Sequence, residues 1–327
     1  MRKILITGGA GFIGSHITER MCASFPGTEV VVLDKMTYAA DISYILPLIA
    51  NDRVQLVVGD ICDYELCRRA VEGCDLVIHA AAESHVDRSF HSSILFTQTN
   101  ALGTHSVMEA CRFARVNRVI HVSTDEVYGE VLDAAYDENG TLNPTNPYSA
   151  SKAAAEMIVN GYRHSFKLPV LIVRANNIFG IRQFPEKLIP RCIMQLLAGR
   201  KIPLHGNGQN VRHYLAAADF ASALTILAER GALNEVYNIG SPDEFTNRQV
   251  AQMMCDAFLA DFEASVEFVE DRPFNDRRYA ISWEKIAALG WTPQHSLPQE
   301  LPDIIAWYRK NEQHLQRRML ELHSNTS

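Results

Sequence analysis

The sequence has little concentrated positive charge, no long apolar run and no paired cysteine motif. Its 31 lysine and arginine residues are outnumbered by 38 acidic residues, which gives a net charge of −7, and they form no basic cluster. Sequence-independent binding to nucleic acid needs a concentrated Lys/Arg surface, so no nucleic-acid partner is expected. An anionic ligand would be held by a few placed basic residues and by helix N-termini.

The seven cysteines are scattered, odd in number and without a CxxC pair. Such spacing argues against a disulfide framework and a zinc site, so no metal is expected. No apolar run is long enough to span a bilayer, and the chain starts directly with a strand pattern where a signal peptide would lie. These features predict a soluble, cytoplasmic protein with reduced, mostly buried thiols and no membrane partner.

The N-terminus carries a glycine-rich turn between a strand and a helix. Residues Lys3–Thr7 have the pattern of a buried strand, and Gly8–Gly14 follows at once and opens a helix. Gly8, Gly11 and Gly14 permit a tight turn, a close approach of the backbone to a pyrophosphate, and packing of helix on sheet. The pattern predicts a dinucleotide-binding unit of Rossmann type, with the diphosphate at the helix N-terminus.

The ends of the next three predicted strands suit a dinucleotide. Asp34 ends the second strand, where it can accept hydrogen bonds from adenosine ribose hydroxyls and would repel a 2′-phosphate, so NAD is favoured over NADP even with Lys35 adjacent. After the third strand, Asp60 either contacts the adenine or caps the next helix. After the fourth, the small residues Ala80–Ala82 either let a flat cofactor approach the backbone or serve tight packing.

A hydroxyl and two carboxyl groups follow the fifth predicted strand, Arg118–Val122. The segment Ser123–Gly129 therefore lies at the carboxyl edge of the sheet, where ligands bind in open α/β folds. Its adjacent acids, Asp125 and Glu126, could divide general-acid and general-base work, one protonated and the other ionised. The alternative is a polar turn with a solvated acid pair.

A helix is predicted after the polar loop at residues 133–143. Asn146 suits an N-cap and Pro147 the first helical position, which places Tyr148 and Lys152 four residues apart on one helix face. A cation beside a phenol lowers the phenol pKa from about 10 toward neutrality. Such a tyrosine could take the proton of a sugar hydroxyl while hydride leaves its carbon; the alternative is an interfacial tyrosine with a solvated lysine.

Repeated strand–helix units predict an α/β fold, a doubly wound parallel sheet with right-handed crossovers. A further strand, Pro169–Arg174, precedes a looser region with a helix to about Gly199 and a loop at Pro203–Gly208. Val236–Gly240 is expected to return to the main sheet.

The chain is expected to form an NAD-binding Rossmann domain and a smaller C-terminal α/β subdomain that binds the substrate. The first covers residues 1–175, with 206–240 partly returning to it, and the second covers 176–205 and 241–327. Arginine matches phosphate geometry with two parallel donors. The arginines expected to face the cleft from the smaller subdomain are Arg212, Arg272, Arg277 and Arg278.

The glycine run Gly8–Gly14 and the pair Tyr148-x-x-x-Lys152 resemble those of the extended short-chain dehydrogenase/reductases acting on nucleotide sugars. Within that group the chain is similar to the dTDP-glucose 4,6-dehydratases along almost its whole length. The motifs that carry this similarity are Ala82–Ser89, Ser123–Gly129, Asn176–Asn177, Gln183–Pro190, Asp271–Pro273 and Asp276–Tyr279. The resemblance implies an NAD-dependent hydro-lyase of deoxysugar biosynthesis, commonly a homodimer paired through helices near residues 103–115 and 149–164.

The resemblance also implies an intramolecular redox cycle on a nucleotide-diphosphate sugar. Tyr148, supported by Lys152, would remove the proton of the 4-hydroxyl while C4 gives hydride to NAD⁺, and Thr124 would hold the same oxygen. Glu126 would take the C5 proton and Asp125 would protonate the departing 6-hydroxyl. NADH would then return hydride to C6, leaving a 4-keto-6-deoxy sugar nucleotide.

Two sets of binding residues follow from these motifs and from the resemblance. The residues expected to bind NAD are Gly8, Gly11, Phe12, Ile13, Gly14, Asp34, Lys35, Thr37, Asp60, Ile61, Ala80, Ala81, Ala82, Ser84, Thr99, Tyr148, Lys152 and Asn177. The residues expected to bind the sugar nucleotide are Ser84, Thr124, Asn176, Lys187, Leu188, Pro203, Leu204, His205, Arg212, Asn247, Asp271, Arg272, Pro273, Phe274 and Asn275.

Several positions depart from the family pattern where substituents of the substrate would be read. Phe274-Asn275 stands where bacterial thymidine-nucleotide enzymes usually carry Gly-His, and it is similar to the UDP-glucose dehydratases of rhamnose synthesis; Arg174-Ala175 differs too. The predicted function is therefore 4,6-dehydration of dTDP-glucose or a closely related nucleotide hexose, with UDP-glucose as the alternative substrate. A nucleotide-sugar 4-epimerase or decarboxylase, and a non-enzymatic NAD-binding regulator, are further alternatives on the same scaffold.

Overall fold

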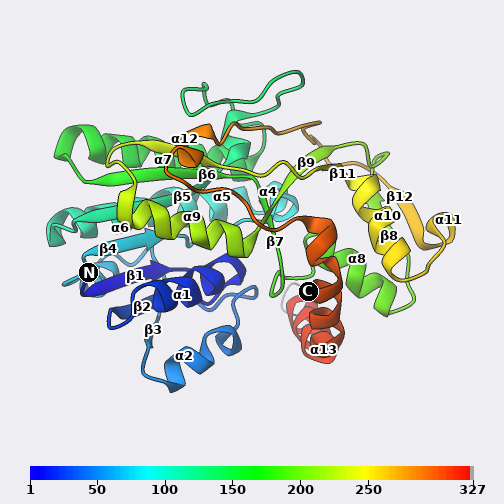
Figure 1. The fold of residues 1–327 in the computed structure, drawn as a ribbon, viewed down its shortest axis with the longest axis horizontal. Coiled ribbons are helices and arrows are strands. Elements are labelled where there is room, and N and C mark those ends of the chain that lie inside the picture. The colour runs from blue at the N-terminus through cyan, green and yellow to red at the C-terminus, as the bar shows by residue number, and fades with distance from the viewer. Residues whose placement is uncertain (325–327) are drawn as a thin grey trace.

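In a computed structural model, which describes residues 1–324, the centre of the molecule is a seven-stranded parallel sheet (Figure 1). The strand order is β10-β6-β5-β4-β1-β2-β3, which is the doubly wound arrangement predicted from the sequence. The strands are β1 (Lys3–Thr7), β2 (Glu29–Asp34), β3 (Val54–Val58), β4 (Leu76–His79), β5 (Arg118–Thr124), β6 (Val170–Ala175) and β10 (Val236–Ile239).

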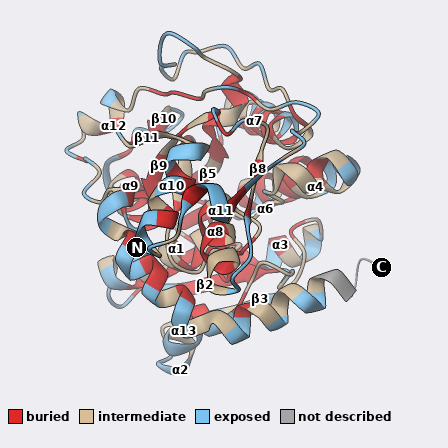
Figure 2. Cartoon of the chain, turned by 90° about the vertical axis from the view of Figure 1, so that its right-hand side faces the viewer, coloured by how far each residue is buried: buried red, intermediate tan, exposed pale blue. Residues whose placement is uncertain are grey.

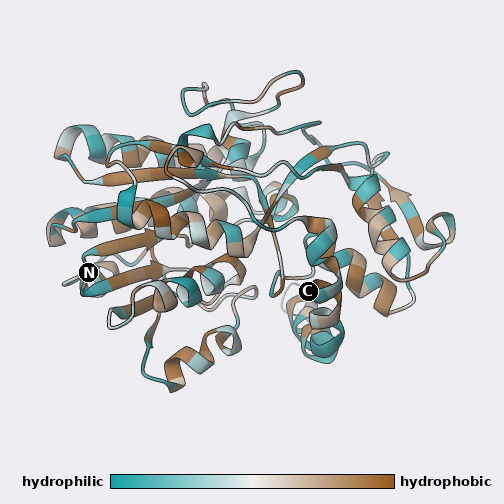
Figure 3. Cartoon of the chain, viewed as in Figure 1, coloured by the Kyte–Doolittle hydropathy of each residue, from teal (hydrophilic) through white to brown (hydrophobic). Residues whose placement is uncertain are grey.

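Alternate residues of the strands face two layers of helices. Ile4 and Ile6 of β1 belong to a buried cluster with α1 (Phe12–Ser24), α9 (Ala217–Arg230) and α12 (Glu284–Ala287). Leu5 belongs to a second cluster with α3 (Tyr64–Ala70), α6 (Gly103–Ala114) and α7 (Pro147–Phe166). Because both faces are covered, the strands are mostly hydrophobic, as the brown centre of Figure 3 shows.

Short helical segments connect these elements. The 3₁₀ and π segments are η1 (Ile42–Tyr44), η2 (Thr97–Leu102) and η3 (Asp125–Tyr128), and the short α-helices are α2 (Leu46–Ala50), α4 (Val86–His91) and α5 (Ser93–Phe96). Strand β5 runs through Ser123 and Thr124, so the turn that follows it begins at Asp125.

The rest of the described chain forms a smaller unit beside the carboxyl ends of the strands. It has a three-stranded sheet of order β11-β9-β7 and a parallel pair, β12-β8. Its strands are β7 (Asn177–Phe179), β8 (Ile202–His205), β9 (Val211–Ala216), β11 (Glu244–Thr246) and β12 (Val266–Val269), and its helices are α8 (Leu188–Leu197), α10 (Asn247–Ala257), α11 (Phe262–Ser265) and α13 (Leu297–Ser324). These elements bury a core of their own.

The segment Pro203–His205 is a strand, so its prediction as a loop is wrong. Strand β8 pairs in parallel with β12, with Ile202 opposite Val266. The turn is confined to residues 206–208, where Gly206 and Gly208 have φ of +56° and +70°. The two paired strands are far apart in the chain, so no local sequence pattern indicates their pairing. The glycines after β8 indicated a turn, and the prediction wrongly included the preceding residues in it.

Helix α7 begins where its predicted cap lies. The Asn146 side chain accepts a hydrogen bond from the Ser149 N–H at 2.9 Å, and the Ser149 side chain bonds back to the cap backbone. Pro147 occupies the first turn. This capping box satisfies N–H groups that the helix itself cannot, and it fixes where the helix starts.

All seven cysteines are free thiols, and all except Cys62 are buried. Figure 2 shows the central strands among the buried residues and the outer surfaces of the helices exposed. Within residues 1–324, no helix is both long and apolar enough to cross a membrane. In the same described range, no three His, Cys, Asp or Glu side chains gather as metal ligands would.

Candidate functional site

A cleft lies along the carboxyl ends of the main strands, between the sheet and the smaller unit. It consists of a larger cavity of about 310 Å³ and a smaller one of about 150 Å³. The residues that line both cavities, and so join them, are Glu126, Asn177, Ile178, Gln183, Glu186 and Lys187. This position is the ligand-binding edge that parallel sheets provide.

The glycines after β1 shape one end of the larger cavity. Gly8 has φ +72°, and a Cβ there would lie 2.8 Å from the Ala81 Cα. A Cβ at Gly14 would lie 1.9 Å from the Gly8 carbonyl oxygen. Both positions therefore require glycine for the fold itself. Gly11 differs, because its nearest neighbour would be 3.4 Å away, and it opens onto the cavity at the N-terminus of α1.

Asp34 at the end of β2 is buried, and its carboxylate accepts hydrogen bonds from the Ala10 N–H (2.9 Å) and the Met36 N–H (2.8 Å). Burial raises the pKa of Asp34, and these backbone donors oppose the rise. The Lys35 ammonium is 2.7 Å from the Asp60 carboxylate. Lys35 is thus engaged by an acid at the cavity wall.

The alternative in which Asp60 caps the next helix is wrong. Asp63 caps α3, because its side chain accepts from the Leu66 N–H at 3.0 Å. Asp60 instead lines the larger cavity and pairs with Lys35.

Every residue predicted to bind NAD lines the larger cavity. The sequence motifs therefore converge on one surface, although they come from the ends of several strands, from η2 and from α7. Lining residues that the sequence reasoning missed include Ala39, Ala40, Glu83, Val122, Gln183 and Phe184. A location directly after β2 or β4 could have indicated some of them, whereas Gln183 and Phe184 come from the distant loop after β7.

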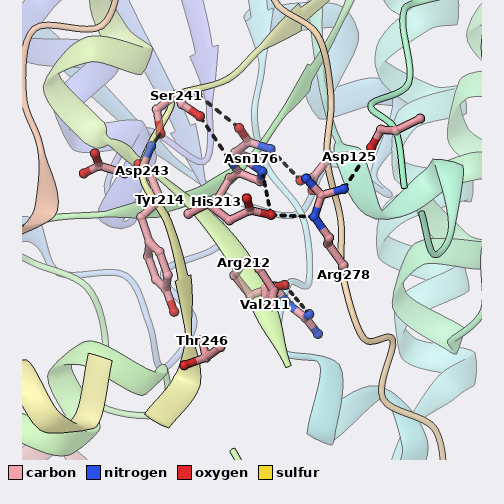
Figure 4. Close-up of polar contacts among 12 residues, drawn as sticks. Asp125, Asn176, Val211, Arg212, His213, Tyr214, Ser241, Asp243, Thr246 and Arg278 are labelled. Atoms are coloured by element: carbon pink, nitrogen blue, oxygen red, sulfur yellow. Dashed lines mark hydrogen bonds and ion pairs between the residues drawn. The ribbon is translucent and has the colours of Figure 1, made fainter. Parts of the chain in front are cut away.

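Thr124, Asp125 and Glu126 lie at the end of β5, next to the junction of the two cavities. Thr124 lines the larger cavity and Glu126 lines both. Asp125 is 2% exposed and lines neither cavity. Its Oδ2 accepts a hydrogen bond from the Asn176 side chain at 2.8 Å (Figure 4). Its Oδ1 is 3.3 Å from the Thr124 hydroxyl.

The orientation of the Asn176 amide is fixed by its second partner. The Ser241 N–H, which can only donate, lies 3.2 Å from Asn176 Oδ1 (Figure 4). The Asn176 NH₂ group must therefore face Asp125, and Asp125 Oδ2 must accept. A proton on the Asp125 carboxyl then belongs on Oδ1, on the side of Thr124.

Burial raises the pKa of Asp125 to about 7, while the Asn176 hydrogen bond opposes the rise and the Glu126 carboxylate adds to it. Burial also raises the pKa of Glu126, against the attraction of Arg212 and Lys187. The Asn146 side chain donates to Glu126 Oε2 at 3.3 Å. Asp125 is therefore poised to hold or release a proton near neutral pH.

Tyr148 and Lys152 project from one face of α7 into the larger cavity. The prediction that Lys152 lowers the Tyr148 pKa is wrong for the protein alone. Burial, and then the charge of Glu126, raise the pKa of Tyr148 above 10. The Lys152 ammonium donates to the Val122 carbonyl at 2.7 Å, and burial lowers the pKa of Lys152 to about 8. The spacing on the helix was predicted correctly, but the effect of burial was not visible in it.

The smaller cavity gathers residues predicted to bind the sugar nucleotide. Those that line it are Lys187, Leu188, Pro203, Leu204, His205, Arg212, Asn247, Arg272, Phe274 and Asn275. Ser84, Thr124 and Asn176 line the larger cavity instead. Asp271 and Pro273 line neither cavity. Residues missed by the sequence reasoning include His85, Val86, Asn146, Arg191, Tyr214 and Tyr279.

The basic side chains at the cleft are held by specific partners. Arg272 Nε is 2.5 Å from Asp87 Oδ1, which links the segment after β12 to α4. Lys187 Nζ donates to the Ser84 carbonyl at 2.6 Å. Arg212 donates to the Asn275 side chain at 3.2 Å. Arg212 and Arg272 thus lie ready at the cavity wall for an anionic ligand.

Arg277 and Arg278 do not face the cleft, contrary to expectation, and neither lines a cavity. The Arg278 guanidinium pairs with Glu244 at 2.5 Å and donates to the Ala134 carbonyl at 2.9 Å. Figure 4 shows this side chain beside His213. The Glu244 carboxylate and the Leu132 and Ala134 carbonyls hold the Arg278 guanidinium away from the cleft, and Arg277 is exposed to solvent. A count of arginines in the sequence does not show such partners.

The fold and this cleft define a dinucleotide-binding protein of the short-chain dehydrogenase/reductase class, with an acid pair added beside the Tyr-x-x-x-Lys residues. The chain belongs to the nucleotide-sugar 4,6-dehydratase family, since the family model described as GDP-mannose 4,6 dehydratase matches residues 5–304. The resemblance inferred from the sequence motifs is confirmed.

Relatives and solved structures support this placement. A trifunctional UDP-glucose 4,6-dehydratase/UDP-4-keto-6-deoxy-D-glucose 3,5-epimerase/UDP-4-keto-L-rhamnose-reductase of Arabidopsis thaliana is 43% identical over 316 residues, which is 95% of this chain and 47% of that protein. The chain thus spans about half the length of this relative. The dTDP-D-glucose 4,6-dehydratase of Homo sapiens is 39% identical over 317 residues, 95% of this chain and 91% of that protein.

Among solved structures, the dTDP-glucose 4,6-dehydratase DesIV from Streptomyces venezuelae, with NAD bound, superposes with a TM-score of 0.94 at 40% identity. The match covers 97% of this chain and 99% of that one. The UDP-glucose 4-epimerase of Thermus thermophilus, in complex with NAD, gives a TM-score of 0.86 at 30% identity, with 94% and 99% covered. The fold is therefore shared by two reactions, and the site residues must distinguish them.

Proposed function

We propose that the protein is an NAD-dependent hydro-lyase that converts dTDP-glucose, or a closely related nucleotide hexose, to its 4-keto-6-deoxy form. The observation that carries the proposal is the meeting of two residue sets at one cleft. Tyr148 and Lys152 of α7 line it, and of the acid pair after β5 Glu126 lines it while Asp125 is buried against the lining residues Thr124 and Asn176. Oxidation and water elimination on one sugar need both sets.

The larger cavity fits NAD. Space above Gly11 at the α1 N-terminus suits a diphosphate, and Ala80–Ala82 leave a flat wall for the cofactor. Asp34 opposes a 2′-phosphate, and Lys35 is already paired with Asp60. The residues proposed to hold the cofactor are the eighteen predicted from the sequence. When bound, NAD supplies the oxidising and reducing equivalents of the cycle.

Tyr148 takes the proton of the 4-hydroxyl, and Thr124 holds the same oxygen. In the protein alone burial keeps the phenol of Tyr148 protonated, so the tyrosine acts as a base only when positive charge lies beside it. Lys152, one turn further along α7, already shares the helix face of Tyr148, and the oxidised nicotinamide of NAD⁺ would add further positive charge when bound.

Glu126 removes the C5 proton that the 4-ketone makes acidic, and Asp125 protonates the departing 6-hydroxyl. The two carboxyl groups have surroundings that suit these tasks. Glu126 opens onto both cavities and faces the cations Arg212 and Lys187. Asp125 has a pKa of about 7 and so retains a proton over part of the neutral range.

The smaller cavity is proposed to bind the nucleotide-diphosphate sugar. Arg212, Arg272 and Lys187 bring three cations to its wall, which suits a diphosphate. The exposed ring of Phe274, 48% accessible, offers an apolar face to a base. The full set proposed to bind the sugar nucleotide is the one predicted from the sequence, although Asp271 and Pro273 would act from outside the cavity.

UDP-glucose is the second candidate substrate. The Arabidopsis relative, whose name begins with UDP-glucose 4,6-dehydratase, is 43% identical to this chain. The residues Phe274-Asn275 also resemble those of the UDP-glucose dehydratases. A 4-epimerase is supported by the similar fold alone, because an epimerase has no use for an acid and a base directed at C6 and C5. The buried acid Asp125 therefore favours dehydration.

A panel of dTDP-, UDP-, GDP- and CDP-hexoses tests the proposal. The purified protein should form a 4-keto-6-deoxy product from the dTDP or the UDP sugar, detected by mass loss of one water. Recovery of an epimer that keeps its 6-hydroxyl would contradict the proposal and support epimerisation. Binding of NAD without turnover of any hexose nucleotide would support a regulator.

We also propose a cytoplasmic homodimer with the two-domain division given by the sequence. The seven free thiols support a reducing compartment. The separate core of the smaller unit supports the division at 175/176, with α9 and β10 returning to the main sheet. Helix α12, within the range given to the smaller unit, also packs against the main sheet. Exposed Phe113 of α6 and Met157 and Phe166 of α7, each more than half accessible, support a partner surface on these packed helices.

A further inference from the structure

A buried ion pair lies directly beneath the cleft. Arg174, near the end of β6, and Glu156, on α7, are 5% and 0% exposed. The Arg174 guanidinium donates from Nη2 to Glu156 Oε2 at 2.7 Å and from Nε to both carboxylate oxygens at 3.1 and 3.2 Å. Neither side chain lines either cavity. The proposed chemistry does not use this pair.

The ion pair ties together the elements that carry the proposed chemistry. The Ser123 hydroxyl donates to Glu156 Oε1 at 2.5 Å, and Arg174 Nη1 donates to the Tyr128 hydroxyl at 2.6 Å. The Tyr128 hydroxyl in turn donates to the Asn238 side chain on β10 at 2.9 Å. The pair therefore joins β5, η3, α7, β6 and β10 through charge-assisted hydrogen bonds.

The contacts fall next to the proposed catalytic residues on both sides. Ser123 precedes Thr124, and Tyr128 closes the turn that begins with Asp125 and Glu126. Glu156 lies one helical turn beyond Lys152 and two turns beyond Tyr148 on α7. The Glu156 carboxylate thus holds the helix with the tyrosine and lysine against the end of β5, and Arg174 links it to the turn with the two acids through Tyr128.

Stability alone gives little reason for such a pair. Removing two charges from water is costly, and apolar residues of similar volume often replace a buried ion pair without loss of stability. Glu156 also acts electrostatically on Lys152, because its negative charge opposes the burial that lowers the Lys152 pKa. Glu156 therefore acts on the proposed catalytic residues both through its hydrogen bonds and through its charge.

We propose that Glu156 and Arg174 are positioning residues for the dehydration cycle. Their ion pair sets the spacing between Tyr148-Lys152 and Asp125-Glu126. The proposal rests on the proposed function, since it concerns how the two residue sets act on one sugar.

The first test replaces Glu156 by glutamine, which keeps the shape and removes the charge. Glu156→Gln should bind NAD and substrate within about twofold of the unaltered protein and lose at least tenfold in kcat. The alkaline limb of C4 oxidation should move to lower pH, because Lys152 loses the anion that raises its pKa and so gives up its proton earlier. Glu156→Asp keeps the negative charge, so the alkaline limb of its pH profile should stay at the same pH even if kcat falls.

Two further variants complete the design. The double variant Glu156→Met/Arg174→Met should fold, with a melting temperature near that of the unaltered protein, yet lose at least tenfold in kcat. Glu235→Gln, which removes a half-exposed ion pair with Lys285 at the start of β10, is the matched control and should retain full activity.

The outcomes separate this inference from the proposed function. An active unaltered protein with an equally active Glu156→Gln variant and an unmoved pH limb would overturn the positioning role. An unaltered protein that dehydrates no hexose nucleotide would overturn the function instead. In that case the inference can still be tested without substrate, by measuring the pKa of the Lys152 ammonium by ¹⁵N NMR. This pKa should be lower in Glu156→Gln than in the unaltered protein, and an unchanged pKa would contradict the inference.

Discussion

At the level of single residues, Asp125 and Glu126 are neighbours in sequence with opposite surroundings. Asp125 is buried against Asn176, and Glu126 opens onto the cleft opposite two cations. Sequence could suggest a division of labour but not its direction. Burial raises the pKa of both groups, to about 7 for Asp125, where the Glu126 charge adds to the rise, whereas the nearby cations Arg212 and Lys187 oppose the rise at Glu126.

Asp125→Asn tests the acid. Asparagine keeps the shape but cannot give up an acidic proton, so we expect normal C4 oxidation and an elimination step slower by about 10²–10⁴-fold. Rapid-quench analysis of a single turnover should show NADH accumulating before product. Asp133→Asn, on the exposed polar loop, is the control. Elimination at the unaltered rate in Asp125→Asn would remove Asp125 from its proposed role.

The pH dependence of elimination provides a second test at this scale. If protonated Asp125 is the acid, the elimination rate should fall as pH rises through about 7. Asn176 donates to the Asp125 carboxylate and so favours its ionised form. In Asn176→Ala the acid should keep its proton to higher pH, and the falling limb should move upward. A limb that stays in place would show that another group titrates.

At the level of elements, the glycines in the turn from β1 to α1 have different roles: some are needed for the fold and one is proposed to make room for the ligand. Gly8 and Gly14 are required by a positive φ or by a close backbone contact, whereas Gly11 has ordinary space around it. The glycine pattern in the sequence could not assign these separate roles, because spacing alone treats the three alike.

Gly8→Ala and Gly11→Ala should therefore fail in different ways. Gly8→Ala should lower the free energy of unfolding by about 1–2 kcal/mol or more, since alanine is strained at that φ and its Cβ meets Ala81. Gly11→Ala should unfold like the unaltered protein but bind NAD at least about tenfold more weakly, a cost of about 1.4 kcal/mol. Chemical denaturation and NAD titration distinguish them; equal effects on both quantities would contradict this division.

Elements whose signals are local were predictable from sequence. The strand before Gly8 and the cap of α7 depend on neighbouring residues and lie where predicted. The acid turn also follows its predicted strand, but the strand runs two residues further, through Thr124. The pairing of β8 with β12 and the contact of Arg174 with Glu156 join distant parts of the chain. No window of sequence contains both partners, so these features emerged only from the folded arrangement.

At the level of the whole molecule, a main sheet and a smaller unit enclose one cleft, and helices α6 and α7 present exposed apolar side chains away from it. Met157 is 53% accessible although it lies in the same helix as Tyr148 and Lys152. A partner on this surface would cover these side chains and brace the helix that carries the proposed base.

Met157→Glu should therefore dissociate the proposed dimer. A charge at the centre of an apolar contact is costly to bury, so sedimentation velocity should show a monomer at concentrations where the unaltered protein is dimeric. Leu259→Glu, at a 97% exposed position in the smaller unit, is the control and should stay dimeric. Equal sedimentation of Met157→Glu and the unaltered protein would place any interface elsewhere.

The most direct measurement of the whole account follows one atom through the cycle. A dTDP- or UDP-glucose carrying deuterium at C4 is given to the protein, and the product is analysed for the position of the label. If Tyr148, Glu126 and Asp125 act in turn on a sugar that never leaves the cleft, the deuterium should reappear at C6 of a 4-keto-6-deoxy sugar. Loss of the label to solvent, or a product that keeps its 6-hydroxyl, would contradict the account.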